Sequence, residues 1–382
     1  MKRVIIIGAG PAGLIAAISA KTHYPIYEVI ILERNEIVGK KLRLTGGGRC
    51  NVTCDISLAE FIEWTPKNAK FLYSTLNNFN SKDVIKFFEK NNCPLKKEDH
   101  NRMFPKSDKA IDIINVLLRK INELKIKIIY NTLVTEVKTK EKTLITNKKK
   151  YNYDYLIIAT GGITYPQTGS DGIGYKLATM IGHTITELLP AEVPLVSNDE
   201  VITSKALLGL SFKDVKLKIK NKEIIHDLIF THFGISGPAA LRASYYVIEE
   251  LKKKNLVTIT IDFFKDLSKE EISNLPKNEL TKHLPKRFIN YLESISKTKE
   301  EFINLLKNFP LSIYTTKGLK MAFVTNGGVS IKEIDPKTMK SKIDNSVSFC
   351  GEIIDVNSFT GGLNITLAFS TGYTAGKYLV NN

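Results

Sequence analysis

The sequence predicts an α/β protein in which a Rossmann-like nucleotide-binding domain is interrupted by a β-barrel-like insert and a small helical insert. Three observations lead to this fold class. A strand, a glycine turn and a helix open the chain, short β-rich runs fill part of its second half, and glycine-rich segments return near Asn326. At 382 residues, of which 43% are hydrophobic, the chain is long enough for two or three domains. We expect a nucleotide-binding domain of residues 1–190 and 321–382, a β-rich insert of 191–266 and a helical insert of 267–320.

The first element is a βαβ unit. "KRVIIIGAGPAGLIAAISAK" predicts a strand at 3–7, a glycine turn and a helix at 11–21, and "YEVIILER" predicts the next strand. Gly8, Gly10 and Gly13 stand between strand and helix, and Glu33 ends the second strand. With this spacing the glycines allow a tight turn, approach of a pyrophosphate and close helix packing, while the acid accepts hydrogen bonds from a ribose. A purely structural glycine turn is the alternative.

The next part of the chain switches between helical and strand-like patterns. We expect three helices and then two strand-rich segments, at 57–61, 81–91, 110–124, 125–140 and 142–160. Beyond residue 191, "EVPLVS", "KDVKLKIK", "HDLIFTHF" and "NLVTITIDFF" predict a small sheet or barrel. A lysine-rich stretch at 268–308 predicts helices, and a run of small residues at 368–376 predicts a final helix.

Two later segments indicate which dinucleotide the turn would bind. "YDYLIIATGG" runs from an apolar strand into Ala159, Thr160 and Gly161, and "VSFCGEIIDV" ends a strand at Gly351 and Glu352. Such segments are typical of FAD-binding two-domain oxidoreductases, in which the first lies near the adenosine half and the acidic residue of the second holds the ribityl chain. An ordinary strand end is the alternative for the first segment alone, but all three signatures in order favour FAD.

The chain resembles the BaiN/RdsA family of NAD(P)/FAD-dependent oxidoreductases over nearly its whole length. The resemblance rests on the ordered motifs "GAGPAG", "TGGGRCNVT", "RMFPKSDKA", "TGSDGIGYKLATMIGH", "THFGISGPAAL", "TNGGVSIKEIDPKTMKSK" and "GEIIDVNSFTGGLNITLAFSTGYTAG". It implies a FAD domain built from both ends of the chain, with a β-barrel-like and a helical insert. The substrates that it implies include uridine in ribosomal RNA, unsaturated steroid-like ketones and small amines. Because a second GxGxxG motif is absent, NAD(P)H would be a transient reductant.

The fingerprint and the resemblance together single out candidate FAD contacts. The glycines at 46–48 would let main-chain amides approach the flavin, with Arg49 and Asn51 as further donors. The helix after "TGGLN" would point its positive end at the flavin N1 and C2 carbonyl, and a simple helix cap is the alternative. The full set is Gly8, Gly10, Gly13, Glu33, Arg34, Lys41, Thr45, Gly46, Gly47, Arg49, Asn51, Val134, Ala159, Thr160, Gly161, Gly351, Glu352, Gly362, Asn364 and Ile365.

Three side chains are candidates for the chemistry itself. Cys50 should lie close to the flavin, where its thiol could donate a proton, contact the substrate or only fill space. His232 joins a strand end to a glycine turn in "THFGISGP", and a structural histidine is the alternative. Arg102, like Arg43 and Arg49, is one of few arginines in a lysine-rich chain, which favours a position where a planar fork matters over a surface role.

The remaining residue types predict no metal centre. Cys50, Cys54, Cys93 and Cys350 form no CxxC pair and no ligand spacing with the six histidines, so we expect reduced thiols, with a Cys50–Cys54 redox pair as the less usual alternative. No apolar run approaches the roughly 20 residues of a membrane span, and glycines interrupt the apolar N-terminus where a signal peptide would be continuous. We therefore expect a cytoplasmic protein that does not bind a membrane.

The charge of the chain bears on its partner. The formal net charge is +16, and residues 81–150 contain 18 Lys or Arg against nine Asp or Glu. Such a surplus favours structured RNA as a partner, although a general bias toward lysine would also produce it. The hypotheses are a reductase of uridine in ribosomal RNA, a small-molecule flavin oxidoreductase, and a non-catalytic RNA-binding protein that contains FAD. The sequence does not indicate an oligomeric state.

Overall fold

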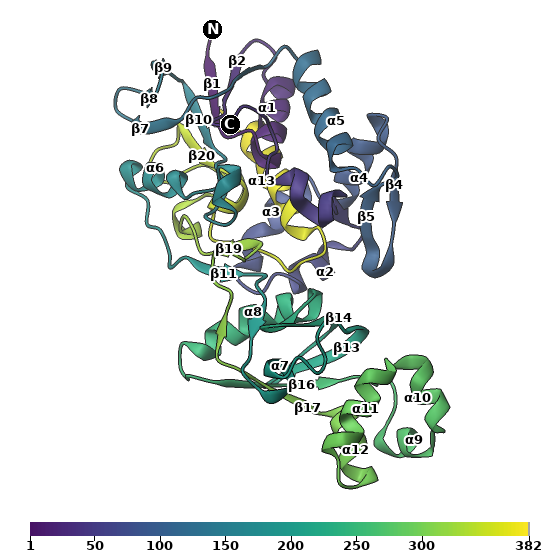
Figure 1. Cartoon of the computed structure of the whole chain (residues 1–382). Coiled ribbons are helices and arrows are strands. Elements are labelled where there is room, and N and C mark those ends of the chain that lie inside the picture. The colour runs from purple at the N-terminus through teal and green to yellow at the C-terminus, as the bar shows by residue number, and fades with distance from the viewer. Residues whose placement is uncertain (381–382) are drawn as a thin grey trace. The chain divides into compact units, whose positions relative to one another are not determined.

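A computed structural model describes residues 1–380, which divide into two compact units (Figure 1). The first unit contains Met1–Leu189 and resumes at Val324, and the second contains Pro190–Phe323. Each unit has its own hydrophobic core. The sequence analysis divided the chain at 190 and 321 and treated the helical insert as separate. In the structure that helical segment shares a unit with the β-rich segment.

A five-stranded parallel sheet forms the centre of the first unit, as the α/β prediction requires. Its order is β20-β10-β1-β2-β6, with β1 at Arg3–Ile7, β2 at Glu28–Leu32, β6 at Lys127–Ile129, β10 at Tyr155–Ile158 and β20 at Val347–Phe349. The strands are apolar runs because both faces of the sheet are covered, and Ile5 and Ile6 are fully buried. Ile6 pairs with Ile157 and Ile31, so the carboxyl ends of these strands meet at one edge.

Two helices from opposite ends of the chain pack against each other beside this sheet (Figure 1). They are α1, Pro11–His23, and α13, Leu363–Lys377. A Cβ on Gly372 would lie 2.3 Å from the carbonyl oxygen of Ala12, so the helices approach too closely for a larger residue. The final helix begins five residues before the predicted start, because Gly362 initiates it and the first turn is not made of small residues.

Smaller elements complete the first unit. Two small antiparallel sheets, of order β3-β5-β4 and β7-β8-β9, come from the part of the chain between β2 and β10. Their strands are β3 Thr53–Cys54, β4 Leu95–Lys97, β5 Arg102–Pro105, β7 Val134–Lys138, β8 Thr143–Thr146 and β9 Lys150–Asn152, and a further strand of this unit is β19, Val324–Asn326. The helices are α2 Leu58–Glu63, α3 Tyr73–Asn78, α4 Ser81–Lys90, α5 Ala110–Glu123 and α6 Ile173–Ile181. The helices predicted at 57–61, 81–91 and 110–124 correspond to α2, α4 and α5.

The second unit is built on a seven-stranded antiparallel sheet of order β17-β16-β13-β14-β15-β12-β18. The sequence predicted a barrel-like insert, but the strands do not close into a barrel within the described residues. The edge strands β17 and β18 follow each other in the chain with Tyr314 between them, yet no ladder joins them. The bounds are β12 Leu195–Val196, β13 Ser211–Ile219, β14 Lys222–Thr231, β15 Gly234–Ser236, β16 Val257–Asp262, β17 Phe309–Ile313 and β18 Thr315–Thr316. Strand β11, Leu189–Ala191, leads into this unit.

The second unit also contains several helices. They are α7 Glu200–Thr203, α8 Pro238–Leu251, α9 Lys269–Asn274, α10 Lys277–His283, α11 Lys286–Ile295 and α12 Lys299–Lys307. The last four lie within the lysine-rich stretch that predicted helices. Helix α8 lies in a segment that the sequence analysis described only as β-rich. Pro238 at its first turn and a pair of alanines are ordinary helix-start signals that were missed.

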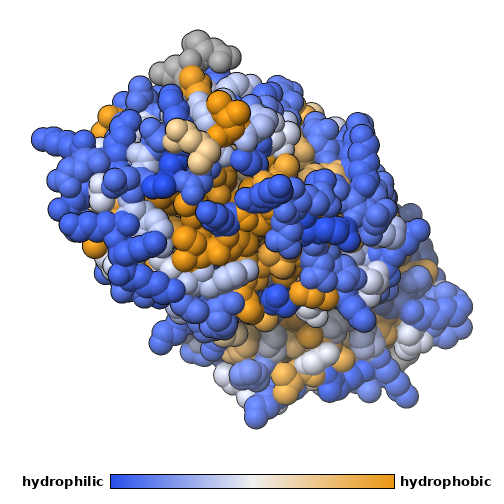
Figure 2. All heavy atoms as spheres, turned by 90° about the horizontal axis from the view of Figure 1, so that it is seen from above, coloured by the Kyte–Doolittle hydropathy of each residue, from blue (hydrophilic) through white to orange (hydrophobic). Residues whose placement is uncertain are grey.

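The surface is mainly polar. Hydrophilic side chains cover most of the face shown in Figure 2, with an area of hydrophobic side chains among them. In the part of the chain that the structure describes, no helix combines the length and apolar character that a membrane crossing needs.

Candidate cofactor and active site

The glycine turn after β1 is tightly packed on one side and open on the other. Gly8 has a left-handed φ of 103°, and a Cβ there would lie 2.6 Å from the carbonyl oxygen of Ala159. A Cβ on Gly13 would lie 1.9 Å from the carbonyl oxygen of Gly8, so only glycine lets α1 pack here. At Gly10, in contrast, a Cβ would meet nothing within 4 Å. The open side is the one on which a pyrophosphate could reach the backbone.

Glu33 is fixed directly after β2. The residue is buried, its Oε2 accepts a hydrogen bond from the Ala9 amide at 2.7 Å, and its Oε1 accepts from the backbone and side-chain nitrogens of Asn35. The carboxylate is thereby held beside the glycine turn, as a ribose contact requires. The neighbouring Arg34 forms an ion pair with Asp171 at 2.6 Å, which occupies part of its donor capacity.

The segment after β10 lies beside the glycine turn, because β10 pairs with β1. Gly161 has a left-handed φ of 77°, and Ala159 is buried. The Oγ1 atom of Thr160 is buried and has no hydrogen-bond partner among the described residues. Val134, predicted as a further contact, is the buried first residue of β7 and pairs with Thr146.

Glu352 is the centre of a polar network that joins four separate segments. Its Oε2 accepts from Lys41 Nζ at 2.7 Å, and its Oε1 accepts from the Thr325 amide at 2.9 Å and from Thr164 Oγ1 at 3.1 Å. Lys41 Nζ also donates to Thr164 Oγ1 at 2.8 Å. Lys41, Gly351 and Glu352 were predicted from the sequence. The two threonines were not, because an isolated threonine carries no motif signal.

The triple-glycine loop has an unusual backbone. Gly46, Gly47 and Gly48 have left-handed φ values of 57°, 66° and 89°. A Cβ on Gly47 would meet no atom within 4 Å, so this part of the loop is open. Thr45 holds the start of the loop, because its Oγ1 donates to the carbonyl oxygen of Leu42 at 2.7 Å.

Arg49 follows the loop, and its guanidinium nitrogens bind side chains of the protein itself. Its Nε donates to Asp108 Oδ1 at 2.8 Å, it forms an ion pair with Glu98, and its guanidinium lies 4.1 Å from the centre of the Phe104 ring. The predicted role as a cofactor donor therefore competes with two carboxylates for the same nitrogen atoms.

The start of α13 has free donors and a buried acceptor beside it. Gly362 has a left-handed φ of 94°, and no side chain caps the first turn. The Oδ1 atom of Asn51 is buried without a partner among the described residues and lies next to Gly362. Asn364 instead bonds to Ser358 through its Oδ1 and Nδ2 atoms, and the following Ile365 is partly buried. The first-turn amides can therefore meet an acceptor from outside the helix.

The predicted catalytic thiol is enclosed. Cys50 has no exposed surface and a left-handed φ of 61°. Burial raises the pKa of its thiol to about 12, although a hydrogen bond with Thr45 partly offsets this effect. The side chain belongs to the core of the first unit, and all four cysteines are buried and outside any disulfide. These surroundings favour the space-filling alternative for Cys50 over a proton donor.

Arg102 and His232 lie in different units. Arg102 opens β5, donates to the carbonyl oxygen of Asp99 at 3.2 Å and forms an ion pair with the carboxylate of the same residue. His232 is exposed in the turn between β14 and β15, with its ring edge-on to Phe233 at a centroid distance of 4.9 Å.

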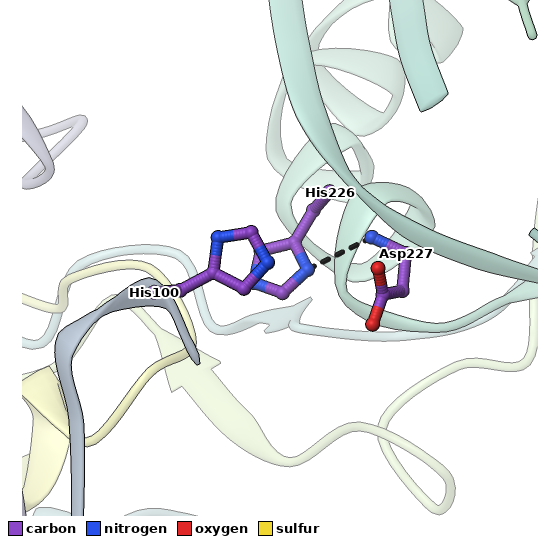
Figure 3. Close-up of side chains that lie close together, drawn as sticks. All are labelled: His100, His226 and Asp227. Carbon is purple, nitrogen blue, oxygen red and sulfur yellow. Dashed lines mark hydrogen bonds between the residues drawn. The ribbon is translucent and has the colours of Figure 1, made fainter. Parts of the chain in front are cut away.

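The second unit contains a better-buried histidine that sequence reasoning passed over. His226 lies on β14, and its Nδ1 accepts a hydrogen bond from the Asp227 amide at 2.8 Å (Figure 3). His100, which is also drawn in Figure 3, belongs to the first unit, where its carbonyl oxygen accepts from Cys54 Sγ at 3.4 Å. Neither residue stands in a motif, so the sequence offered no signal for it.

Several observations in the first unit fit a bound FAD. Buried polar atoms without partners cost free energy unless a ligand or water pairs with them, and Thr160 Oγ1, Asn51 Oδ1 and Arg43 Nε are such atoms within the described residues. The open side of Gly10 and the fixed Glu33 would hold the ADP half. The triple-glycine loop and the first turn of α13 would meet the flavin half.

Comparisons with known proteins agree with this geometry. Residues 2–378 match a family model described as the HI0933-like protein Rossmann domain. The chain is 28% identical to 3-dehydro-bile acid delta(4,6)-reductase from Clostridium scindens, over 99% of this chain and 98% of that protein. It is 27% identical to ribosomal RNA dihydrouridine synthase from Escherichia coli, over 98% of this chain and 97% of that protein.

Solved structures show the same fold. The structure of 3-ketosteroid-delta4-(5alpha)-dehydrogenase from Rhodococcus jostii RHA1 aligns with a TM-score of 0.54 and 13% identity, over 98% of this chain and 97% of that one. At this identity the likeness concerns the fold alone.

Proposed function

The chain belongs to the HI0933-like family of Rossmann-domain flavoprotein oxidoreductases, and from this premise we propose that it reduces a uridine in ribosomal RNA to dihydrouridine. That it is a FAD-dependent oxidoreductase follows from the family, which also goes against the non-catalytic alternative. The choice of substrate rests on the relatives named ribosomal RNA dihydrouridine synthase, in Escherichia coli and Haemophilus influenzae, which match nearly the whole chain.

The charge of the chain supports an RNA substrate. The net charge is +16, and Lys148, Lys149 and Lys150 are exposed around the β8–β9 turn. Lys148 Nζ donates to the Tyr130 carbonyl oxygen at 2.8 Å, and Lys149 lies over the Tyr151 ring. Contacts within the protein therefore orient two of the three lysine side chains. Lysines of this kind neutralise backbone phosphates without reading sequence.

The proposed reaction adds one hydride and one proton across a double bond. FAD, when bound and reduced by NAD(P)H, supplies the hydride for uridine C6. The protein must polarise the C4 carbonyl, which takes up charge as the hydride arrives, and must deliver a proton to C5. The base has to leave its stack to enter the site. Of the three candidate side chains, His232 is exposed and carries the group that most often transfers protons in enzymes.

Ribosomal RNA from cells provides the test. RNA from a strain that lacks the gene should lose one dihydrouridine, and a plasmid copy should restore it. A copy with Gly10→Val should not restore it, because the added side chain would stand where the pyrophosphate approaches. An unchanged set of dihydrouridines in the deletion strain would disprove the proposal.

The relative named a bile acid reductase favours a second candidate, the reduction of an unsaturated small-molecule ketone. The two candidates differ in their dependence on salt. RNA binding should weaken by roughly 0.7 to 0.9 log units per log unit of salt for each phosphate contacted, whereas turnover of a neutral ketone should hardly change. Replacing Lys148, Lys149 and Lys150 by Gln should flatten the slope for RNA and leave ketone turnover unaffected.

A further inference from the structure

We infer that Arg49 is a positioning residue that holds the triple-glycine loop in place through a clamp formed by Glu98, Asp108 and Phe104. This inference rests on the proposed function in one respect, namely that the loop meets the flavin. It differs from the expectation drawn from sequence, in which Arg49 donates hydrogen bonds to the cofactor itself.

The guanidinium of Arg49 contacts two carboxylates and an aromatic ring. Arg49 Nε donates to Asp108 Oδ1 at 2.8 Å, its Nη2 lies 2.7 Å from the same oxygen, and its Nη2 also binds Glu98 Oε1. The planar group stacks on Phe104 at 4.1 Å. One edge of the fork is therefore bound to two carboxylates, and one face is covered by a ring.

The two carboxylates are themselves held in place. Lys96 Nζ donates to Asp108 Oδ2 at 2.6 Å and lies 3.3 Å from Glu98 Oε1. Hydrogen bonds to Lys96 and Arg49 lower the pKa of Asp108, and the bond to Arg49 lowers that of Glu98. Asp108 has a left-handed φ of 54°, in a tight turn that its amide closes onto the Pro105 carbonyl oxygen at 2.9 Å. Lys96 thus holds both acceptors together with Arg49.

The clamp acts on the loop through two links. Arg49 is bonded to Gly48, and its amide donates to the Gly46 carbonyl oxygen at 3.3 Å. A Cβ on Gly46 would lie 3.3 Å from Phe104 Cε1, so the ring that stacks on Arg49 also borders the loop. Glycines in the left-handed region gain the most freedom when they are released. A contact with residues outside the loop is therefore needed to hold the loop backbone in one conformation.

Two variants distinguish a clamp from a direct cofactor donor. The double variant Glu98→Gln/Asp108→Asn frees Arg49 without removing it, and Arg49→Gln removes the guanidinium. The clamp predicts that both loosen the loop and weaken FAD binding, by about three- to tenfold, because exposed ion pairs contribute modestly. A direct donor predicts the opposite for the double variant, since a freed Arg49 could bind the cofactor better. The matched control is Lys97→Gln, which lies next to Glu98 at the end of β4 but pairs with Asp55 at 3.1 Å.

Two measurements decide between these outcomes. Amide hydrogen exchange over residues 42–52, in protein without added FAD, should speed up in both variants and not in the control. FAD affinity, from the change in flavin fluorescence, should fall in both. Unchanged exchange, or unchanged or tighter FAD binding in the double variant, would overturn the inference. If the wild-type protein binds no FAD, the proposed function fails while hydrogen exchange still decides about the clamp.

Discussion

The two glycine-rich turns of the first unit require glycine for different structural reasons. At Gly8 and Gly13 a Cβ would collide with backbone oxygen atoms, so glycine is required by packing between strand and helix. At Gly47 a Cβ would meet nothing, and glycine is required there by a left-handed backbone. The first turn is held by close packing between strand and helix and by the hydrogen bond from the Ala9 amide to Glu33, and the second by ion pairs at Arg49. A glycine motif therefore indicates where backbone can be approached, but not what keeps the backbone in place.

The largest expected effect comes from the packed turn. Gly13→Ala puts a methyl group 1.9 Å from the Gly8 carbonyl oxygen, and we expect a loss of about 3 kcal/mol or more in the free energy of unfolding. Gly10→Ala meets no atom and should cost only about 0.5–1 kcal/mol, because alanine is a poorer N-cap than glycine, while still weakening FAD binding. Denaturant unfolding and FAD titration of both variants provide the measurements. If Gly13→Ala and Gly10→Ala were equally stable, the two sides of the turn would not differ in how tightly they are packed.

A smaller effect is expected at Cys50, which anchors the second turn from inside. Cys50→Ala should lower the free energy of unfolding by about 1–2 kcal/mol, because the thiol is fully buried. The rate of substrate reduction in a single turnover should stay unchanged. A clear slowing at this step, with FAD still bound, would restore the thiol to the role of proton donor.

The open loop should tolerate a side chain more easily. Gly47→Ala keeps a φ of 66°, which costs about 1 kcal/mol for a residue with a Cβ, and the Cβ has room. Stability should therefore fall much less than for Gly13→Ala, whereas FAD affinity should fall because the methyl group covers the open face. Thermal unfolding together with FAD titration separates these effects, and normal FAD affinity would place the cofactor elsewhere.

The smallest effect is a dependence of the second turn on pH and salt. The pKa values of Glu98 and Asp108 are lowered in the folded protein, so their contribution is present above the ordinary carboxyl range. It is lost as the pH falls below the ordinary carboxyl range and through the lowered folded values. The protection of the amides at 42–52, measured against their intrinsic exchange rate at each pH, should therefore fall at acid pH and in about 1 M salt, while that of the Gly8–Gly13 turn changes less. Equal responses of both turns would contradict the comparison.

The features that could be predicted depend on residues that are close together in the sequence. The βαβ unit and the α/β class could be predicted because apolar runs and spaced glycines are local patterns, and the family was predicted from the resemblance of its ordered motifs. Arg49 shows the limit. Its sequence position suggested a cofactor donor, but its partners Glu98 and Asp108 come from a part of the chain about fifty residues away, and no local pattern pairs them.

Other features were missed for the same reason. The network around Glu352 depends on Thr164 and Thr325, which meet only when three distant segments fold together. The full burial of Cys50 depends on how the core closes around it, which its polar and glycine-rich neighbours in sequence do not reveal. The open sheet of the second unit could not be told from a barrel, because strand patterns do not encode closure.

The division of the first unit between both ends of the chain has a consequence for its synthesis. Strand β10 is complete at Ile158, but its outer neighbour β20 begins only at Val347, and the helix that packs on α1 comes later still. On the ribosome, β10 therefore presents an unpaired edge while the whole second unit, with its own core, is being made. The nascent chain can fold its insert first, and the nucleotide-binding sheet closes only when the last strand and helix have emerged.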